Sequence, residues 1–146
     1  ADPIHMEVVP KINLAIKNRD FWMPFAPVIM DKWADKYLVN PKGIESPFMT
    51  IGFETTALGW RDLPAACHQA DHSVRPQILA REANPELYKI LEEFERITGR
   101  GALLNTSFNL HGYPIVNTEK DALHVFIDSG LDALVLNHFL IKRINQ

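Results

Sequence analysis

The sequence predicts an α/β (α+β) fold in which a twisted mixed sheet has flanking helices. Helical patterns alternate along the chain with short apolar runs of strand length. The 146 residues are 47% hydrophobic and 23% charged, a composition that can build a buried core. No internal repeat and no Gly/Ser-rich linker divides the chain, so we expect one domain over residues 1–146.

The first half of the chain predicts two helices and several strands. Residues 7–17 carry apolar side chains at helical spacing. Residues 25–30 form an apolar run that prolines interrupt, which predicts a strand near a sheet edge. Residues 31–38 predict a short helix with Trp33 and Tyr37 on one face. The other elements expected in this half are strands at 48–55, 65–68 and 76–80 and a loop at 69–75.

The second half contains the clearest helix, residues 85–98. Asn84 is its expected N-cap and Gly99 its expected end. Its apolar stripe consists of Leu87, Ile90, Leu91 and Phe94. Another helix is expected after Thr118, which forms a capping-box-like start with Asp121. That helix should run to about residue 129, and strands are expected at 102–104, 133–136 and 139–142.

Composition excludes several classes of protein. The formal net charge of −3 argues against a general nucleic-acid-binding domain. No apolar run reaches the roughly 20 residues that cross a bilayer, and no signal-peptide pattern stands at the start. The one cysteine, Cys67, excludes an intramolecular disulfide and is interpreted as a packing residue. We therefore expect a cytoplasmic protein without a membrane or nucleic-acid partner, and a second copy of the chain is a further candidate partner.

Two cations, Lys17 and Arg19, stand at the end of the first predicted helix. They could simply interact favourably with the negative end of the helix dipole. The stiff aromatic and proline-rich segment that follows, Phe21–Pro27, instead favours cations that are held in place, as a phosphate site requires.

A second polar cluster spans residues 68–77. His68 and His72 lie four residues apart in a predicted loop with no third ligand nearby, so a zinc site is disfavoured and no metal site is expected. Asp71 and Arg75 either pair with each other, or Asp71 holds the loop while Arg75 offers its planar guanidinium to a phosphate.

A third cluster gathers short polar side chains at a predicted strand end: Asn105, Thr106, Ser107 and Asn109. Unpaired backbone N–H groups at such an end, with hydroxyl and amide donors beside them, suit a phosphate or a carboxylate. An ordinary strand-to-turn connection with satisfied caps is the alternative. The sequence contains neither a G-x-x-x-x-G-K-[ST] loop nor a G-x-G-x-x-G fingerprint, and no nucleophile-elbow pattern.

Four blocks of the sequence resemble the C-terminal, YrdC-like domain of the ATP-dependent O-carbamoyltransferases, the family of antibiotic and nodulation-factor carbamoylating enzymes. The blocks cover nearly the whole chain in the right order, and the Asn-Thr-Ser-Phe-Asn run with its following Gly and Pro is the most specific of them. They are residues 16–27, residues 68–77 around Arg75-Pro76-Gln77, residues 103–116, and residues 121–123 with 130–136.

The resemblance implies that this domain binds ATP and carbamoyl phosphate and forms a carbamoyl-adenylate, with Mg²⁺ accompanying the triphosphate. A separate N-terminal domain of the family, related to sugar kinases and actin, would transfer the carbamoyl group to a small-molecule hydroxyl acceptor. Nothing in these 146 residues corresponds to that domain. We therefore expect a chain truncated at its N-terminus, with any iron or other metal confined to the N-terminal domain.

Joining a carbamoyl group to ATP brings several negative charges together, so fixed cations and donors must surround them. Segments far apart in the sequence must then converge on one anion pocket. Met23 stands where many family members have arginine, and Tyr113 where an acidic residue is common. The residues expected to carry the chemistry are Lys17, Arg19, Arg75 and Ser107, and those expected to bind the nucleotide are Lys17, Arg75, Asn105, Thr106, Ser107 and Asn109.

Two other functions remain open at this point. The chain could be a non-catalytic nucleotide-binding or subunit-docking module, although Trp22, Trp33 and Trp60 are interpreted first as core or interface residues. It could also be a threonylcarbamoyl-adenylate synthase-like enzyme, which its acidic charge disfavours. A titration with ATP distinguishes a nucleotide site from a docking module.

Overall fold

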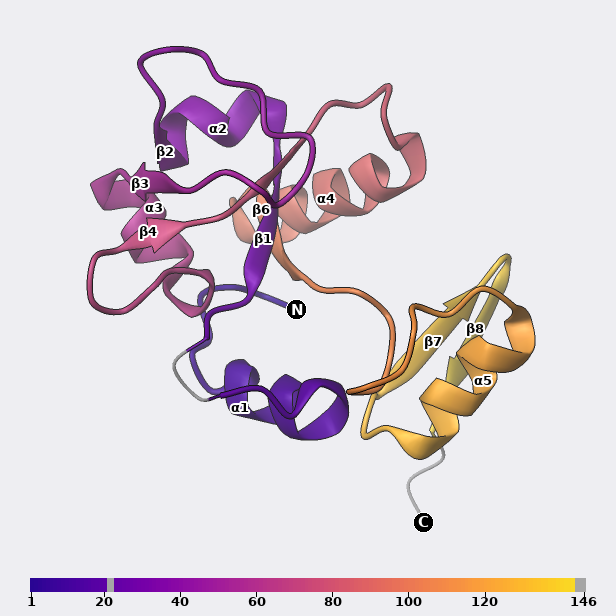
Figure 1. Ribbon diagram of the computed structural model, residues 1–146. Coiled ribbons are helices and arrows are strands. Elements are labelled where there is room, and N and C mark those ends of the chain that lie inside the picture. The colour runs from indigo at the N-terminus through magenta and orange to yellow at the C-terminus, as the bar shows by residue number, and fades with distance from the viewer. Residues whose placement is uncertain (21–22, 144–146) are drawn as a thin grey trace. The chain divides into compact units, whose positions relative to one another are not determined.

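The computed structural model describes residues 1–20 and 23–143, so the expectations for Phe21 and Trp22 lie outside the described residues. Helices and short strands alternate along the chain (Figure 1), and the predicted mixed α/β class is confirmed. The described residues form two compact units, one of residues 1–9 and 23–106 and the other of residues 10–20 and 107–143. Within these residues the strands make three small sheets, two of them antiparallel throughout, where the sequence predicted a single mixed sheet.

The larger sheet of the first unit is mixed and has β1 (Ala26–Met30) at its centre. Strand β5 (Gln77–Leu79) pairs with it in parallel, and β6 (Ala102–Asn105) pairs with it antiparallel. All five residues of β1 are buried. The prediction of an edge strand for residues 25–30 is therefore wrong, because β1 has a partner on both sides.

The position of Pro27 explains how a proline fits in a central strand. Pro27 lies opposite Leu104, whose N–H donates to Ala1 O at 2.8 Å and whose carbonyl accepts from the Ala1 amino group at 3.3 Å. Both backbone groups of Leu104 thus point away from β1, and the parallel ladder to β5 begins only at Val28. The missing N–H of Pro27 costs the sheet no hydrogen bond.

Helix α4 (Pro85–Thr98) has the predicted boundaries. The Asn84 side chain accepts from the Leu87 N–H at 3.1 Å, and Gly99 ends the helix with φ of 73°. Leu91 is fully buried in one cluster with core residues of β1, but Ile90 is 57% exposed, so its place in the apolar stripe was predicted wrongly. The helix buries a narrower face than its sequence suggests.

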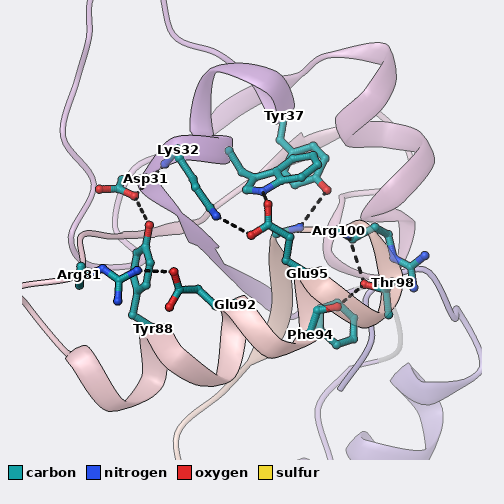
Figure 2. Close-up of polar contacts among 12 residues, drawn as sticks. Asp31, Lys32, Tyr37, Arg81, Tyr88, Glu92, Phe94, Glu95, Thr98 and Arg100 are labelled. Atoms are coloured by element: carbon teal, nitrogen blue, oxygen red, sulfur yellow. Dashed lines mark hydrogen bonds and ion pairs between the residues drawn. The ribbon is translucent and has the colours of Figure 1, made fainter.

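Polar contacts join α4 to helix α2 (Asp31–Tyr37), as Figure 2 shows. Glu95 accepts from Lys32 Nζ at 2.5 Å and from the indole N–H of Trp33 at 2.7 Å. The Tyr88 hydroxyl donates to Asp31 at 2.8 Å. The rings of Trp33 and Tyr37 stack at 5.1 Å between centroids, which confirms that both lie on one face of α2.

A second, antiparallel sheet of the first unit consists of β2 (Leu38–Val39), β3 (Phe53–Thr55) and β4 (Ser73–Val74), with α3 (Ala57–Asp62) nearby. The strand predicted at 48–55 shrinks to β3, because Thr50 N–H donates to Phe48 O and closes a turn. The strand predicted at 65–68 is wrong: Pro64 starts a 3₁₀ turn, η2 (Pro64–Ala66). Strand β4 occupies part of the predicted loop at 69–75.

The second unit contains most of the first helical segment, one further helix and a hairpin. The helix predicted at 7–17 is present as α1 (Val8–Ile12) followed by a π-helical turn, η1 (Asn13–Lys17). Helix α5 (Glu119–Asp128) begins with the predicted Thr118–Asp121 capping box and covers the hairpin of β7 (Ala133–Leu136) and β8 (Phe139–Lys142) (Figure 1). Both hairpin strands have the predicted boundaries.

Cys67 packs in the core of the first unit, where it is 2% exposed. Burial raises the pKa of its thiol to about 12, so the thiol stays protonated. The interpretation of Cys67 as a packing residue is confirmed. In the described part of the chain, no helix is long and apolar enough to span a membrane.

Gly101 lies where a side chain has no room. A Cβ atom at this position would lie 2.1 Å from Cδ1 and 2.3 Å from Cγ of Trp33. The indole cannot withdraw easily, because it stacks on Tyr37 and donates to Glu95. We expect Gly101→Ala to lower the free energy of unfolding in urea by about 2 kcal/mol.

Gly52→Ala is the matched control, since a Cβ at Gly52 would meet nothing within 4 Å. This variant should unfold at nearly the same urea concentration as the parent chain. Equal stability of the Gly101→Ala and Gly52→Ala variants would contradict the close approach of Trp33.

Candidate anion-binding site

The buried ammonium group of Lys17 is the centre of the first candidate site. It lies at the end of η1, and the residue is 4% exposed. Its Nζ donates to Ser107 O at 2.6 Å, to Ser107 Oγ at 2.9 Å and to Asn109 Oδ1 at 2.6 Å. Asn109 O lies 3.4 Å away as a fourth, longer contact, so the three N–H donors of the ammonium group all have acceptors. The structure thus brings together Lys17, Ser107 and Asn109, which the sequence predicted as site residues.

The positive charge of Lys17 has no counter-ion in the described part of the chain, where no carboxylate lies within 4 Å of Nζ. Its acceptors among the described residues are all neutral oxygens. Burial, and to a smaller extent the nearby charge of Arg19, lower the pKa of Lys17 below its ordinary value. A sequestered cation without a compensating carboxylate favours an anionic ligand.

Asn13 holds the backbone that carries this cation. Its side-chain amide donates to Arg19 O at 2.7 Å, and its Oδ1 accepts from Arg19 N–H at 2.8 Å. Between Lys17 and Arg19 the chain passes through Asn18, which has φ of 43° and donates to Asn13 O at 2.7 Å. One side chain therefore closes the turn that separates the two predicted cations, and Arg19 itself lies half-buried.

Ser107 and Asn109 take different roles around the ammonium group. Ser107 is exposed, so a ligand can reach its hydroxyl, which donates to Asn109 Oδ1 at 2.7 Å. The amide N–H₂ of Asn109 donates to the carbonyls of Leu110 and Tyr113 at 3.1 and 2.8 Å. Asn109 therefore shapes the loop with its donors. A phosphate oxygen, as a charged acceptor, competes well with the neutral oxygens that now receive the Lys17 and Ser107 protons.

Arg75 lines a cavity of about 390 Å³ in the first unit. The wall includes residues 23–26, which belong to the block that resembles the family, together with Gly52 and Ala66. Within the described residues the exposed guanidinium of Arg75 makes no hydrogen bond or ion pair. None of the described residues that line the cavity is an aspartate or a glutamate. The cavity can therefore hold an anion against the guanidinium, with apolar side chains around it.

The loop before Arg75 has the Asp71 contacts of the second interpretation offered by the sequence, while a phosphate on Arg75 stays a prediction. Asp71 accepts from Ser73 N–H at 2.9 Å and lies 3.3 Å from His68 Nδ1, so it holds the loop and does not pair with Arg75. Hydrogen bonds from Ser73 keep the pKa of Asp71 below its ordinary value. Arg75 is thus left available to a ligand.

Asn105 and Thr106 lie at the end of β6 in the first unit. The Asn105 amide donates to Gln77 Oε1 at 3.2 Å, which links two of the blocks that resemble the family. Arg75 belongs to the first unit and Lys17 to the second. Their convergence on one pocket, and the roles of Arg19, Asn105 and Thr106, stay predictions.

Two neighbours of the predicted residues were missed as site residues. Asn13 is a lone polar residue six positions before Arg19, and His68 lines the Arg75 cavity. An amide so close to a helix end was the available signal for Asn13. Among the described residues, no group of three or more His, Cys, Asp or Glu side chains could hold a metal ion.

Comparison with known proteins agrees with the resemblance that the four blocks indicate. A family model described as Carbamoyltransferase C-terminus matches residues 1–143. Uncharacterized protein MJ1058 of Methanocaldococcus jannaschii is 38% identical over 143 residues, 98% of this chain and 23% of that protein. Nodulation protein NolO of Bradyrhizobium diazoefficiens is 33% identical over 144 residues, 98% of this chain and 26% of that protein.

Nodulation protein NolNO of Sinorhizobium fredii is also 33% identical over 144 residues, 98% of this chain and 21% of that protein. The chain thus spans about a quarter of the length of these curated relatives. With the family model matching nearly every residue, the chain belongs to the carbamoyltransferase C-terminus family.

Proposed function

We propose that this chain binds ATP with Mg²⁺ and carbamoyl phosphate and forms a carbamoyl-adenylate. A further part of a longer protein would then transfer the carbamoyl group to a hydroxyl group of a small molecule. One observation carries the proposal: in a carbamoyltransferase C-terminal domain, the buried Lys17 ammonium is surrounded by neutral oxygens alone among the described residues.

The Lys17 site suits the nucleotide. A triphosphate brings several negative charges, and the buried cation supplies the charge that neutral donors cannot. Ser107 adds an exposed hydroxyl, and the two hydrogen bonds between the Asn13 side chain and the Arg19 backbone hold the turn in place. These groups are held in place before the ligand arrives, and phosphate oxygens would take over protons that neutral oxygens now accept. Mg²⁺ would be held mainly by phosphate oxygens and water, and would offset the charge of the β- and γ-phosphates.

The Arg75 cavity suits the smaller reactant. Carbamoyl phosphate carries a compact phosphate dianion beside a small amide group. The guanidinium of Arg75 offers parallel N–H donors to the phosphate, while the described part of the cavity wall contributes apolar surface and no carboxylate that would repel it. His68 and Ser73 complete the polar lining.

The proposed reaction has two steps, and in each of them one bond forms and one bond breaks. Water attacks the carbonyl carbon of carbamoyl phosphate, the C–O bond to phosphate breaks with its electron pair on the phosphate, and carbamate and inorganic phosphate result, with the released protons passing to solvent. A carbamate oxygen then attacks the α-phosphorus of ATP, and the electron pair of the broken P–O bond leaves on pyrophosphate. One phosphate and one pyrophosphate are released for each carbamoyl-adenylate. The chain's own contribution is to place the anions and offset their repulsion.

Calorimetric titration with ATP and Mg²⁺ tests the Lys17 site. We expect micromolar binding by the 146-residue chain. Ser107→Ala should weaken it about tenfold, because one charge-assisted contact to a phosphate is lost. Ser129→Ala is the matched control in the same unit, since it removes a serine that donates to Phe126 O at 3.3 Å, within its own helix end. A folded chain that shows no heat with ATP would favour the docking module.

Product release tests the role of Arg75. Phosphate and pyrophosphate should appear in equal amounts only when ATP and carbamoyl phosphate are both present. Arg75→Ala should lower the rate at least about 30-fold, which corresponds to roughly 2 kcal/mol of transition-state stabilisation. Arg96→Ala, which removes an arginine paired with Glu93 on the surface of α4, should leave the rate unchanged. Binding of ATP without any product, or a normal rate in Arg75→Ala, would argue against the proposed chemistry.

A further inference from the structure

The cavity around Arg75 contains a second group that can carry positive charge. His68 lines the same wall, and its backbone is fixed: His68 N–H donates to Ser73 O at 2.8 Å, and His68 O accepts from His72 N–H at 2.9 Å. The imidazole is therefore held at the cavity by its loop. None of the predicted roles uses it.

The Nδ1 atom of His68 is shielded from solvent and makes no well-directed hydrogen bond within the described residues. Asp71 Oδ1 lies 3.3 Å from it, within ion-pair distance. Asp71 is kept ionised by its hydrogen bonds from Ser73. A carboxylate beside Nδ1 favours a proton on that nitrogen, and only the doubly protonated imidazolium also donates from Nε2.

We propose that His68 is a second anion-contacting residue of the Arg75 cavity, donating from Nε2 in its protonated form, with Asp71 as the positioning residue on Nδ1. This inference rests on the proposed function, and it makes the affinity for the phosphate group of carbamoyl phosphate depend on pH. The geometry behind it is the Asp71 carboxylate 3.3 Å from Nδ1 and the place of His68 in the wall of the cavity.

Among the described residues, two charged groups lie around His68 at the cavity. Asp71 comes from its own loop, and Arg75 comes from the same wall of the cavity. The other lining segments, residues 23–26 with Gly52 and Ala66, contribute no titratable side chain. His72 is exposed on the same loop, but its ring stacks on Trp60 at 3.7 Å between centroids and does not line the cavity. His72 therefore serves as a matched imidazole outside the site.

Sulfate is the probe of choice, because it stays a dianion across the range in which histidine titrates. Calorimetric titrations of the 146-residue chain with sulfate at about pH 5.5 and about pH 8 should show affinity falling about tenfold as the imidazolium loses its proton. His68→Gln should bind weakly at both values, without this pH dependence. His72→Gln should behave like the parent chain.

Nitrogen NMR of the histidine side chains gives a second readout that needs no variant at His68. Sulfate added near pH 7 should raise the protonated fraction of His68 and leave that of His72 unchanged. In Asp71→Asn this response should shrink, because the carboxylate that favours the Nδ1 proton is gone.

The outcomes separate this inference from the proposed function. Sulfate affinity that does not depend on pH, or a pH dependence retained in His68→Gln, overturns the role of His68. If Arg75→Ala then abolishes sulfate binding, the cavity is still an anion site and only the role given to His68 is wrong. Absence of sulfate binding at about pH 5.5 also overturns the inference, while the release of phosphate and pyrophosphate still judges the proposed function independently.

Discussion

The buried charge of Lys17 is the constraint on which the candidate nucleotide site depends. An ammonium group is costly to bury unless its protons are all accepted. Ser107 and Asn109 meet this need with neutral oxygens, so Lys17 ties a helix end to a loop some 90 residues later in the chain. The same arrangement leaves the charge uncompensated within the described residues. The contacts that hold this part of the molecule together and the proposed attraction for an anion therefore depend on one group.

The two polar sites follow different physical designs. Around Lys17 the donors and acceptors already bond one another, and a phosphate would enter by replacing neutral acceptors with charged ones. The guanidinium of Arg75 is exposed beside a cavity whose described lining residues include no carboxylate. The first design suits a ligand whose position must be exact, because its contacts are organised beforehand. The second suits a compact anion that enters and leaves a cavity.

Local sequence signals predicted most of the fold. Helix α4 and the hairpin had their predicted bounds because capping residues, turn residues and periodicity act within a few positions. The central place of β1 could not be predicted from Pro27, since it depends on where Leu104 directs its backbone groups. Partners far away in the sequence set this pairing, and periodicity carries no information about them.

The site too was predictable only in part, because residue type does not show which partner a side chain will have. Lys17, Ser107 and Asn109 were expected from their chemistry and from the family resemblance, and the structure places them in contact. The donors of Asn109 turned out to serve its own loop, which residue type alone does not reveal. Asn13 was missed because its partner is the backbone of Arg19, and backbone partners leave no mark on composition.

The most direct test of the candidate nucleotide site is the pKa of Lys17, measured by NMR of its side chain. The Lys17 signal is assigned as the one that Lys17→Met removes. If the ammonium is buried among neutral oxygens, this pKa lies below the ordinary lysine value of about 10.4. Binding of ATP should then raise it, because an adjacent anion stabilises the charged form. A Lys17 that titrates like an exposed lysine and does not respond to saturating ATP would contradict the assignment of this group as the anion-facing cation.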